Sequence, residues 1–151
     1  APAYRLDTGD ALKVLVFGEP DLTAEVVLDE TGIFDYPFIG EVVAAGRTVD
    51  ELERLIDKGL RGDYLIDPEV NVSVVKYRSF FIKGEVRRPG GYEYQPGLTV
   101  VQAIALAGGF TERASRDKLL IERAAKNKTY RARPNTEVGA GDVITVEQSL
   151  F

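Results

Sequence analysis

The sequence predicts an α+β protein built from two small domains, and three observations support this prediction. Short runs with apolar residues at alternate positions, such as 70–74, predict strands along much of the chain. Thr48 and Thr99 each open an apolar stretch with helical spacing, one in each half of the chain. Between the halves, at residues 77–79, one strand pattern gives way to the next with almost no linker. The composition, 44% hydrophobic and 28% charged, is typical of a folded chain.

The first half is expected to begin with three strands. Residues 11–17 carry apolar side chains at alternate positions, and 25–28 and 33–38 are shorter strand-like segments. Glycine, proline and acidic residues at 18–21 and 29–32 interrupt these segments and predict turns.

A helix should follow from Thr48. Thr48 and Glu51 fit a capping box, in which the hydroxyl and the carboxylate each accept a hydrogen bond from an otherwise free backbone N–H. The residues that mark the apolar stripe of this helix are Val49, Leu52, Leu55, Ile56 and Leu60. After Asp67 and Pro68 the alternating segment 70–74 predicts the last strand of a mixed sheet.

The second half predicts a second set of strands with one short helix. Thr99 and Gln102 repeat the capping-box pattern, and Gly108 and Gly109 end the helix at 100–107. The expected strands are 80–86, 92–94, 119–123, 129–132 and 143–146, with a turn at Arg88-Pro89-Gly90-Gly91. We therefore expect domains at residues 1–77 and 78–151.

The two halves differ in charge. Residues 1–76 contain 7 Lys/Arg and 16 Asp/Glu, a net charge of −9, whereas residues 77–151 contain 12 and 8, a net charge of +4. One interpretation is that the halves form complementary faces between subunits, and the other is that they are two separately solvated surfaces. The overall pI near 4.9 and the acidic half argue against a nucleic-acid partner. The cationic residues of the second half, interpreted here as a solvated or subunit-facing surface, include Arg113, Arg116, Lys118, Arg123, Lys126, Lys128, Arg131 and Arg133.

Several kinds of chemistry are excluded by residue types that the sequence lacks. Without cysteine there is no disulfide or thiolate site, and without histidine there is no Ser–His or Zn–His arrangement. We expect no catalytic residue, no metal and no cofactor. The absence of methionine indicates a mature or trimmed fragment. No apolar run approaches the roughly 18 residues of a membrane-spanning helix.

The dipeptide Gly-Asp occurs near both ends of the sequence, at Gly9-Asp10 and Gly141-Asp142. The two aspartates could form a catalytic or metal-binding pair, or each could cap a turn that leads into a strand. We favour the structural interpretation, because neither histidine nor a phosphate-binding loop accompanies the aspartates.

Aromatic residues beside basic ones offer candidate saccharide contacts. Tyrosine rings can stack on sugars, and arginine can bind hydroxyl or acidic groups. The alternative for each tyrosine is packing in the core or on the sheet. The candidate residues are Tyr36, Arg87, Arg88, Tyr92 and Tyr94.

An ordered set of motifs along the chain resembles the outer-membrane polysaccharide export family. The first half carries Tyr4-Arg5-Leu6-Asp7-Thr8-Gly9-Asp10, Phe17-Gly18-Glu19-Pro20-Asp21-Leu22, Tyr36-Pro37-Phe38-Ile39-Gly40 and Asp67-Pro68-Glu69-Val70. The second half resembles the soluble-ligand-binding β-grasp (SLBB) domain, through Ile82-Lys83-Gly84-Glu85-Val86, Pro89-Gly90, the segment 99–109 ending in Gly108-Gly109, and Gly141-Asp142.

The resemblance implies a polysaccharide biosynthesis/export domain followed by a β-grasp-like SLBB domain. It also implies a non-catalytic component of capsule or exopolysaccharide export, in the periplasm of a Gram-negative bacterium with or without association with the outer membrane. The implied partners are polysaccharide, an inner-membrane polysaccharide copolymerase that regulates chain length, and further copies of the chain in a ring. The alternatives are a monomeric periplasmic carbohydrate-binding module and a glycan-processing enzyme with paired carboxylates. Residues with a structural role in the family motifs are Gly9, Asp10, Gly18, Glu19, Pro37, Gly40, Gly84, Pro89, Gly90, Gly108, Gly109, Gly141 and Asp142.

Overall fold

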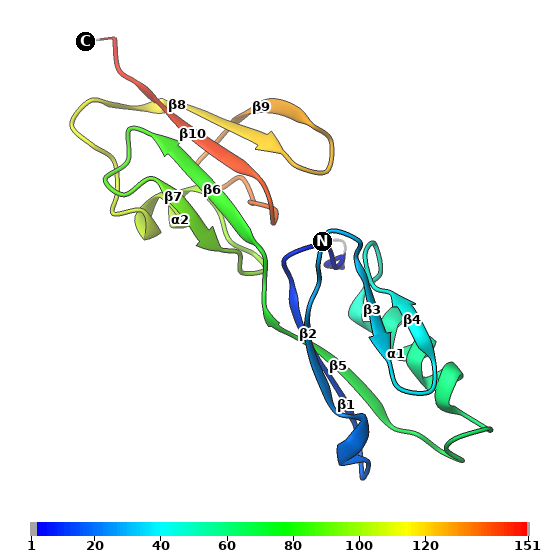
Figure 1. Ribbon diagram of the computed structural model, residues 1–151. Helices are drawn as coiled ribbons and strands as arrows, with labels where there is room; N and C mark the ends of the chain where they lie inside the picture. Colours follow the sequence, from blue (N-terminus) through cyan, green and yellow to red (C-terminus); the bar gives the residue numbers. More distant parts are fainter. Residues whose placement is uncertain (1–2, 151) are drawn as a thin grey trace. The chain divides into compact units, whose positions relative to one another are not determined.

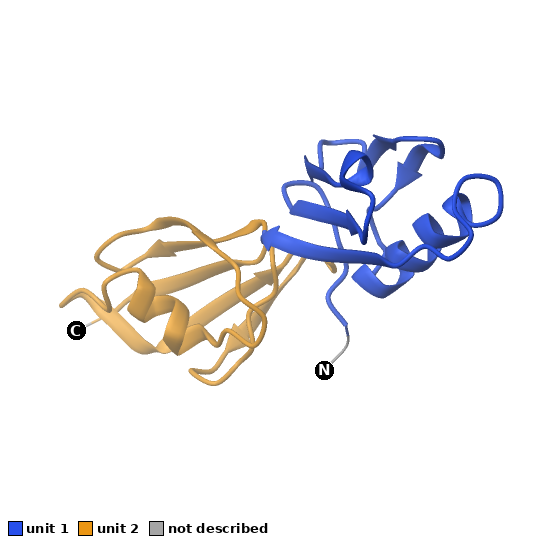
Figure 2. Ribbon diagram, turned by 90° about the horizontal axis from the view of Figure 1, so that it is seen from below, with its two compact units in different colours: residues 1–77 blue, residues 78–151 orange. Residues whose placement is uncertain are grey.

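The computed structural model describes residues 3–150, which divide into two compact units. Unit 1 ends at Tyr77 and unit 2 begins at Arg78, and each has its own helix and its own hydrophobic core (Figures 1 and 2). The predicted α+β class is confirmed, since both units combine one α-helix with mostly antiparallel strands. No helix among the described residues is long and apolar enough to cross a lipid bilayer.

Unit 1 is built on a three-stranded antiparallel sheet, with strand order β2-β1-β5. A separate hairpin of β3 and β4 completes its strands. The elements are β1 (Ala11–Val16), the 3-10 helix η1 (Pro20–Leu22), β2 (Ala24–Val27), β3 (Ile33–Tyr36), β4 (Gly40–Val43), α1 (Val49–Leu60) and β5 (Val70–Lys76). The turn expected at residues 18–21 is thus partly helical, with Pro20 in the first turn of η1.

The helix α1 covers one face of this sheet and packs against β5. Leu52, Ile56 and Leu60 are fully buried and recur at the spacing of one helix face. From the sheet, Leu12, Val14, Val16 and Val72 belong to the same core. The alternating pattern of β1 and the helical stripe therefore meet in one apolar layer, as the sequence predicts.

The third strand is shorter than the sequence predicts. It ends at Tyr36, because Phe38 has φ 68° and leaves the extended conformation. The chain then turns back through Gly40, φ 87°, into β4. The strand β4 was not predicted.

Unit 2 is a five-stranded sheet with strand order β7-β6-β10-β8-β9. The pair β6 and β10 is parallel, and the other neighbours are antiparallel. The elements are β6 (Ser79–Gly84), β7 (Gly90–Glu93), α2 (Val100–Leu106), β8 (Ala114–Arg123), β9 (Lys128–Ala132) and β10 (Val143–Gln148). The helix α2 lies against one face of the sheet (Figure 2), where Ala103 and Ile104 join the core with Ile82, Ile121 and Ile144.

The strand β8 begins earlier than predicted, at Ala114 instead of Leu119. Ala114 pairs with Gln148 after an irregularity in the β8–β10 register, so the first part of β8 continues the sheet despite its charged sequence. Both predicted capping boxes are present. Thr48 and Glu51 start α1, and Thr99 and Gln102 start α2.

Candidate functional site

The carboxylate of Asp10 is fully buried at the start of β1. The Tyr4 hydroxyl donates to both of its oxygens, at 2.7 and 2.9 Å, and the backbone N–H of Asp7 donates to Oδ2 at 2.9 Å. Gly9, with φ 98°, lets the chain turn between these groups. Asp10 therefore ties the chain preceding β1 to the beginning of the strand.

Asp142 occupies the corresponding place before β10 and is 3% exposed. Its Oδ2 accepts from the backbone N–H of Gly139 at 2.7 Å and from Arg123 at 2.8 Å, while Oδ1 accepts from the N–H of Ala124 at 3.0 Å. Gly141 has φ 82°. This aspartate fastens the 139–142 turn to the end of β8.

These contacts help to decide whether the two aspartates have a catalytic or metal-binding role or a structural one. Every carboxylate oxygen of Asp10 and Asp142 already accepts a hydrogen bond from its own unit, and each side chain lies in a turn. Among residues 3–150 no group of three or more Asp and Glu side chains is arranged to hold a metal ion. The geometry supports the structural interpretation of both aspartates.

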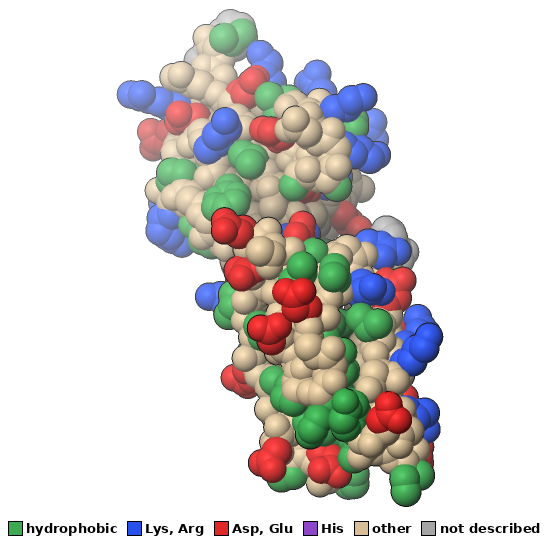
Figure 3. Space-filling model, turned by 45° about the vertical axis from the view of Figure 1, so that its right-hand side comes forward, with side chains coloured by type: hydrophobic (Ala, Val, Ile, Leu, Met, Phe, Trp, Pro, Cys, Tyr) green, Lys and Arg blue, Asp and Glu red, His purple; other side chains and the backbone are tan. Residues whose placement is uncertain are grey.

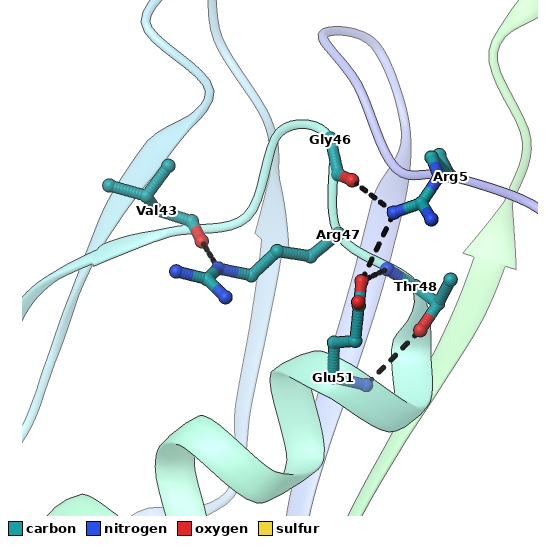
Figure 4. Close-up of polar contacts among 6 residues, drawn as sticks. All are labelled: Arg5, Val43, Gly46, Arg47, Thr48 and Glu51. Atoms are coloured by element: carbon teal, nitrogen blue, oxygen red, sulfur yellow. Dashed lines mark hydrogen bonds and ion pairs between the residues drawn. The ribbon is translucent and has the colours of Figure 1, made fainter.

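A polar network at the start of α1 connects the N-terminal segment to the helix (Figure 4). Arg5 donates to the Gly46 carbonyl at 2.7 Å and lies 3.2 Å from the Glu51 carboxylate. Glu51 in turn accepts from the Thr48 backbone N–H at 2.9 Å, and Thr48 Oγ1 accepts from the Glu51 N–H at 3.2 Å. The hydrogen bond from the Thr48 backbone and then the charge of Arg5 hold the pKa of Glu51 below its usual value.

Tyr36 does not offer a surface to a saccharide. Its side chain is 2% exposed, packs in the core of unit 1 and donates its hydroxyl to the carbonyl of Leu22 at 2.5 Å. Burial raises the pKa of the Tyr36 hydroxyl. The expectation of a saccharide contact is corrected for this residue, which instead anchors η1 to β3.

The other four candidate contacts lie in unit 2, in and after the turn between β6 and β7. Arg87 and Arg88 are exposed, and their backbone N–H groups donate to the carbonyls of Gly109 at 3.1 Å and Ala107 at 2.7 Å. The Tyr92 hydroxyl donates to the Arg88 carbonyl. These bonds pin the turn to the C-terminal end of α2.

Tyr92 and Tyr94 are half-buried and pack against the core of unit 2. The Tyr92 ring lies 6.2 Å from the ring of Phe80. Part of each tyrosine stays accessible, so the structure places two exposed arginines and two accessible tyrosines within one short stretch of chain. A saccharide contact there remains a proposal.

The glycines of the family motifs share one backbone property. Positive φ angles, which other residues rarely adopt, are found at Gly9, Gly18, Gly40, Gly84, Gly90, Gly108, Gly109 and Gly141. Gly84 is the most constrained, because a Cβ atom there would lie 2.1 Å from the carbonyl oxygen of Val146. Of the other motif residues, Pro37 and Pro89 lie in the turns after β3 and β6, and Glu19 directly precedes η1.

Unit 1 carries an exposed pair of aromatic residues whose contact was not predicted from the sequence. The rings of Phe38 and Tyr64 are stacked with centroids 4.5 Å apart, although 61% and 47% of these residues are exposed. Tyr64 also lines a hollow of about 350 Å³ with Phe17 and Ile66, and both of these are largely exposed. Figure 3 shows hydrophobic side chains gathered on the visible face of this unit. From the sequence, Phe38 was predicted only as one aromatic residue of a strand. Its positive φ, which takes it out of the strand, was not predicted.

The two units correspond to two known protein families. Residues 1–75 match the family described as polysaccharide biosynthesis/export protein, and residues 79–139 match the SLBB domain. The chain therefore belongs to the polysaccharide biosynthesis/export family, and within it to the proteins whose export domain is followed by an SLBB domain.

Curated relatives align with most or nearly all of the chain. The exopolysaccharide production protein ExoF of Rhizobium meliloti is 28% identical, and the alignment covers 99% of this chain and 42% of ExoF. The EPS I polysaccharide export outer membrane protein EpsA of Ralstonia nicotianae is 27% identical over 98% of this chain and 48% of EpsA. The polysialic acid transport protein KpsD of Escherichia coli is 26% identical, covering 81% of this chain and 22% of KpsD. The chain thus spans less than half the length of these relatives.

Proposed function

We propose that this protein is a component of a capsular polysaccharide or exopolysaccharide export machinery, and that it forms or adapts the channel through which the polymer passes. The observation that carries the proposal is the ordered match of both units to relatives whose names denote polysaccharide production, export or transport. Light scattering of the purified chain with its native polysaccharide tests it. We expect binding and no shortening of the polymer.

The proposal includes the absence of catalysis. It rests on the lack of histidine and cysteine and on the hydrogen bonds that occupy Asp10 and Asp142 inside their own turns. Turnover of a glycan by the pure protein would contradict this, provided that the activity disappears in Asp10→Asn or Asp142→Asn while the variant stays folded.

The proposed location is the periplasm of a Gram-negative bacterium, with or without association with the outer membrane. The support comes from relatives such as EpsA, which is named as an outer membrane protein. Cell fractionation of the native bacterium tests the location, with the protein expected in the periplasmic or outer-membrane fraction.

Assembly is the fourth part of the proposal. Copies of the chain associate head to tail into a ring, with the acidic unit of one facing the basic unit of the next, and the ring meets an inner-membrane polysaccharide copolymerase. Head-to-tail contacts join two different patches, so each patch can carry one sign of charge. The charge difference supports this, since unit 2 carries numerous Lys and Arg side chains and unit 1 is rich in Asp and Glu (Figure 3).

Polysaccharide contact is proposed at Arg87, Arg88, Tyr92 and Tyr94. Two exposed guanidinium groups and two partly exposed tyrosine rings lie in one short stretch that α2 holds in place. Chemical-shift mapping with an oligosaccharide of the native repeat tests the contact, with Arg54→Gln on the exposed part of α1 as a control that removes one positive charge elsewhere.

A further inference from the structure

A hollow in unit 2 lies beside the β8–β9 hairpin and has a volume of about 410 Å³. Pockets for small ligands commonly have volumes of about 300–1,000 Å³, so this hollow could hold a sugar residue or two. Three arginines line it, Arg116, Arg131 and Arg133, together with the exposed residue Pro134, whereas Leu119 and Ala132 beside them are almost fully buried. The site combines three positive charges with one exposed apolar ring, that of Pro134.

The strand register explains how the arginines come together. Leu119 pairs with Ala132 across the hairpin, and Leu120 pairs with Arg131. Arg116 lies before Leu119 on β8 and Arg133 follows Ala132 after β9, so the antiparallel pairing brings both arginines to the same end of the hairpin. The hollow is therefore a product of regular sheet geometry.

Two contacts limit the freedom of this end of the hairpin. The guanidinium of Arg116 lies 5.0 Å from the centre of the Phe110 ring, a cation–π distance. The backbone N–H of Arg133 donates to Thr136 Oγ1 at 2.8 Å, which orders the loop after β9. Preorganised groups lose less entropy when a ligand binds.

The charges of the three arginines are not matched inside unit 2. Among residues 3–150 none of the three guanidinium groups has a carboxylate within ion-pair distance, in contrast to Arg123, which lies 2.8 Å from Asp142. Asp117 also lines the hollow, but its contact with Arg131 is made by its backbone carbonyl, at 3.5 Å. Three cations against one exposed carboxylate favour an anionic ligand.

We infer that this hollow binds the carboxylate of an acidic sugar residue, with Arg131 and Arg133 as the principal contacts. Arginine presents two N–H groups in the geometry that a carboxylate accepts, and the exposed ring of Pro134 gives the C–H face of a sugar ring an apolar surface. The inference rests on the proposed function, because it is export that brings a polysaccharide to this chain.

A second hollow extends the site along β9. It has a volume of about 360 Å³ and is lined by Arg131 again, with Lys126, Tyr130 and Thr136 among its other residues. Tyr130 is 40% exposed and could stack on a sugar ring. Arg131 is the residue that lines both hollows.

The test is a calorimetric titration of the full chain, at about 0.15 M salt, with a short oligosaccharide that contains glucuronic acid. The matched ligand is the same oligosaccharide after reduction of its carboxyl group to an alcohol. The site predicts that the acidic ligand binds at least about tenfold more tightly, and that Arg131→Gln and Arg133→Gln each abolish most of that preference. Lys83→Gln, which removes one exposed positive charge from β6, should change the affinity less than about twofold.

The possible outcomes separate this inference from the export proposal. Equal affinity for the acidic and the neutral ligand, or no effect of Arg131→Gln in a variant with an unchanged circular dichroism spectrum, overturns the site. Equal binding of single-stranded DNA of the same charge also overturns it, because the surface would then be a non-specific cationic patch. None of these results would contradict the export proposal, because export is measured separately in cells. Loss of export in Arg131→Gln cells would add support.

Discussion

Asp10 and Asp142 make the same local bond in the two units, since each accepts a hydrogen bond on Oδ2 from the backbone N–H three residues earlier. The donors are Asp7, at 2.9 Å, and Gly139, at 2.7 Å. In both turns the aspartate N–H also donates back to the carbonyl of that same residue, at 3.1 Å. The remaining bonds differ, because a tyrosine completes the first site and an arginine the second.

Asp142→Asn is expected to destabilise unit 2 by about 3 kcal/mol. The amide keeps the shape but loses the negative charge opposite Arg123, and its NH2 group replaces one of the two oxygens, so the bonds that this oxygen accepts now are lost. Urea unfolding followed by circular dichroism measures the loss. Glu147→Gln, at an exposed position of β10, is the control and should change the free energy of unfolding by less than about 0.5 kcal/mol. Equal effects of the two substitutions would contradict the structural role of Asp142.

The capping box of α1 predicts a stability that depends on pH. The pKa of Glu51 is lower in the folded chain than its usual value of 4.5, so the bond to Thr48 contributes fully above pH 4.5 and is lost as the pH falls below it. Glu51→Ala should therefore cost stability at pH 7 and cost less as the pH falls through and below 4.5. Urea unfolding at two pH values, pH 7 and a pH below 4.5, measures the difference in the free energy of unfolding.

The second capping box supplies the control. Gln102 makes the same backbone bond at the start of α2, to the Thr99 N–H at 3.0 Å, but carries no ionisable group. Gln102→Ala should cost the same free energy at both pH values. A similar pH dependence for both variants would show that the effect of Glu51 does not come from its ionisation.

Gly84→Ala should prevent unit 2 from folding properly or destabilise it by at least about 3 kcal/mol. The new Cβ would meet the carbonyl oxygen of Val146 at 2.1 Å, so the parallel pairing of β6 and β10 must shift. Gly97→Ala is the matched control, because Gly97 also has a positive φ, 84°, but nothing lies within 4 Å of the added atom. It should cost only the backbone strain, about 1–2 kcal/mol. Equal melting temperatures for the two variants would contradict the close approach.

Head-to-tail association predicts sensitivity to salt. Exposed charge pairs contribute about 0–1 kcal/mol each, so charge mainly selects register while apolar contacts supply most of the affinity. Sedimentation velocity should show larger species at about 0.05 M salt than at about 0.5 M. At the higher concentration the Debye length is shorter than about 10 Å, so the charges of the two units attract each other less. A protein that stays monomeric at high concentration in low salt would favour the monomeric carbohydrate-binding alternative.

The sequence predicts best those features that depend on residues close together in the chain. The two capping boxes join residues three apart, and the stripe of Leu52, Ile56 and Leu60 follows from helical spacing alone. Both were correct for this reason. The left-handed conformation of Phe38 was missed, because only glycine and a few polar residues favour it strongly enough to be predicted.

The candidate site depends on contacts that the sequence does not reveal. Tyr36 was expected to contact a saccharide, yet its partner is the carbonyl of Leu22 within the core. The cationic residues of the second half were apparent, but not that three of them enclose a hollow, since this requires the register of β8 with β9 and the early start of β8 at Ala114.

The most direct measurement of the central claim is the distribution of polysaccharide in the native bacterium after deletion of the gene. Cell-surface and released polymer, and polymer kept inside the envelope, are quantified separately in the deletion strain and in the strain complemented with the full-length gene. A protein of polysaccharide export predicts a drop of at least about tenfold in surface polymer while polymer or its precursors remain inside, with recovery on complementation. Unchanged surface polymer in the deletion strain would contradict the account.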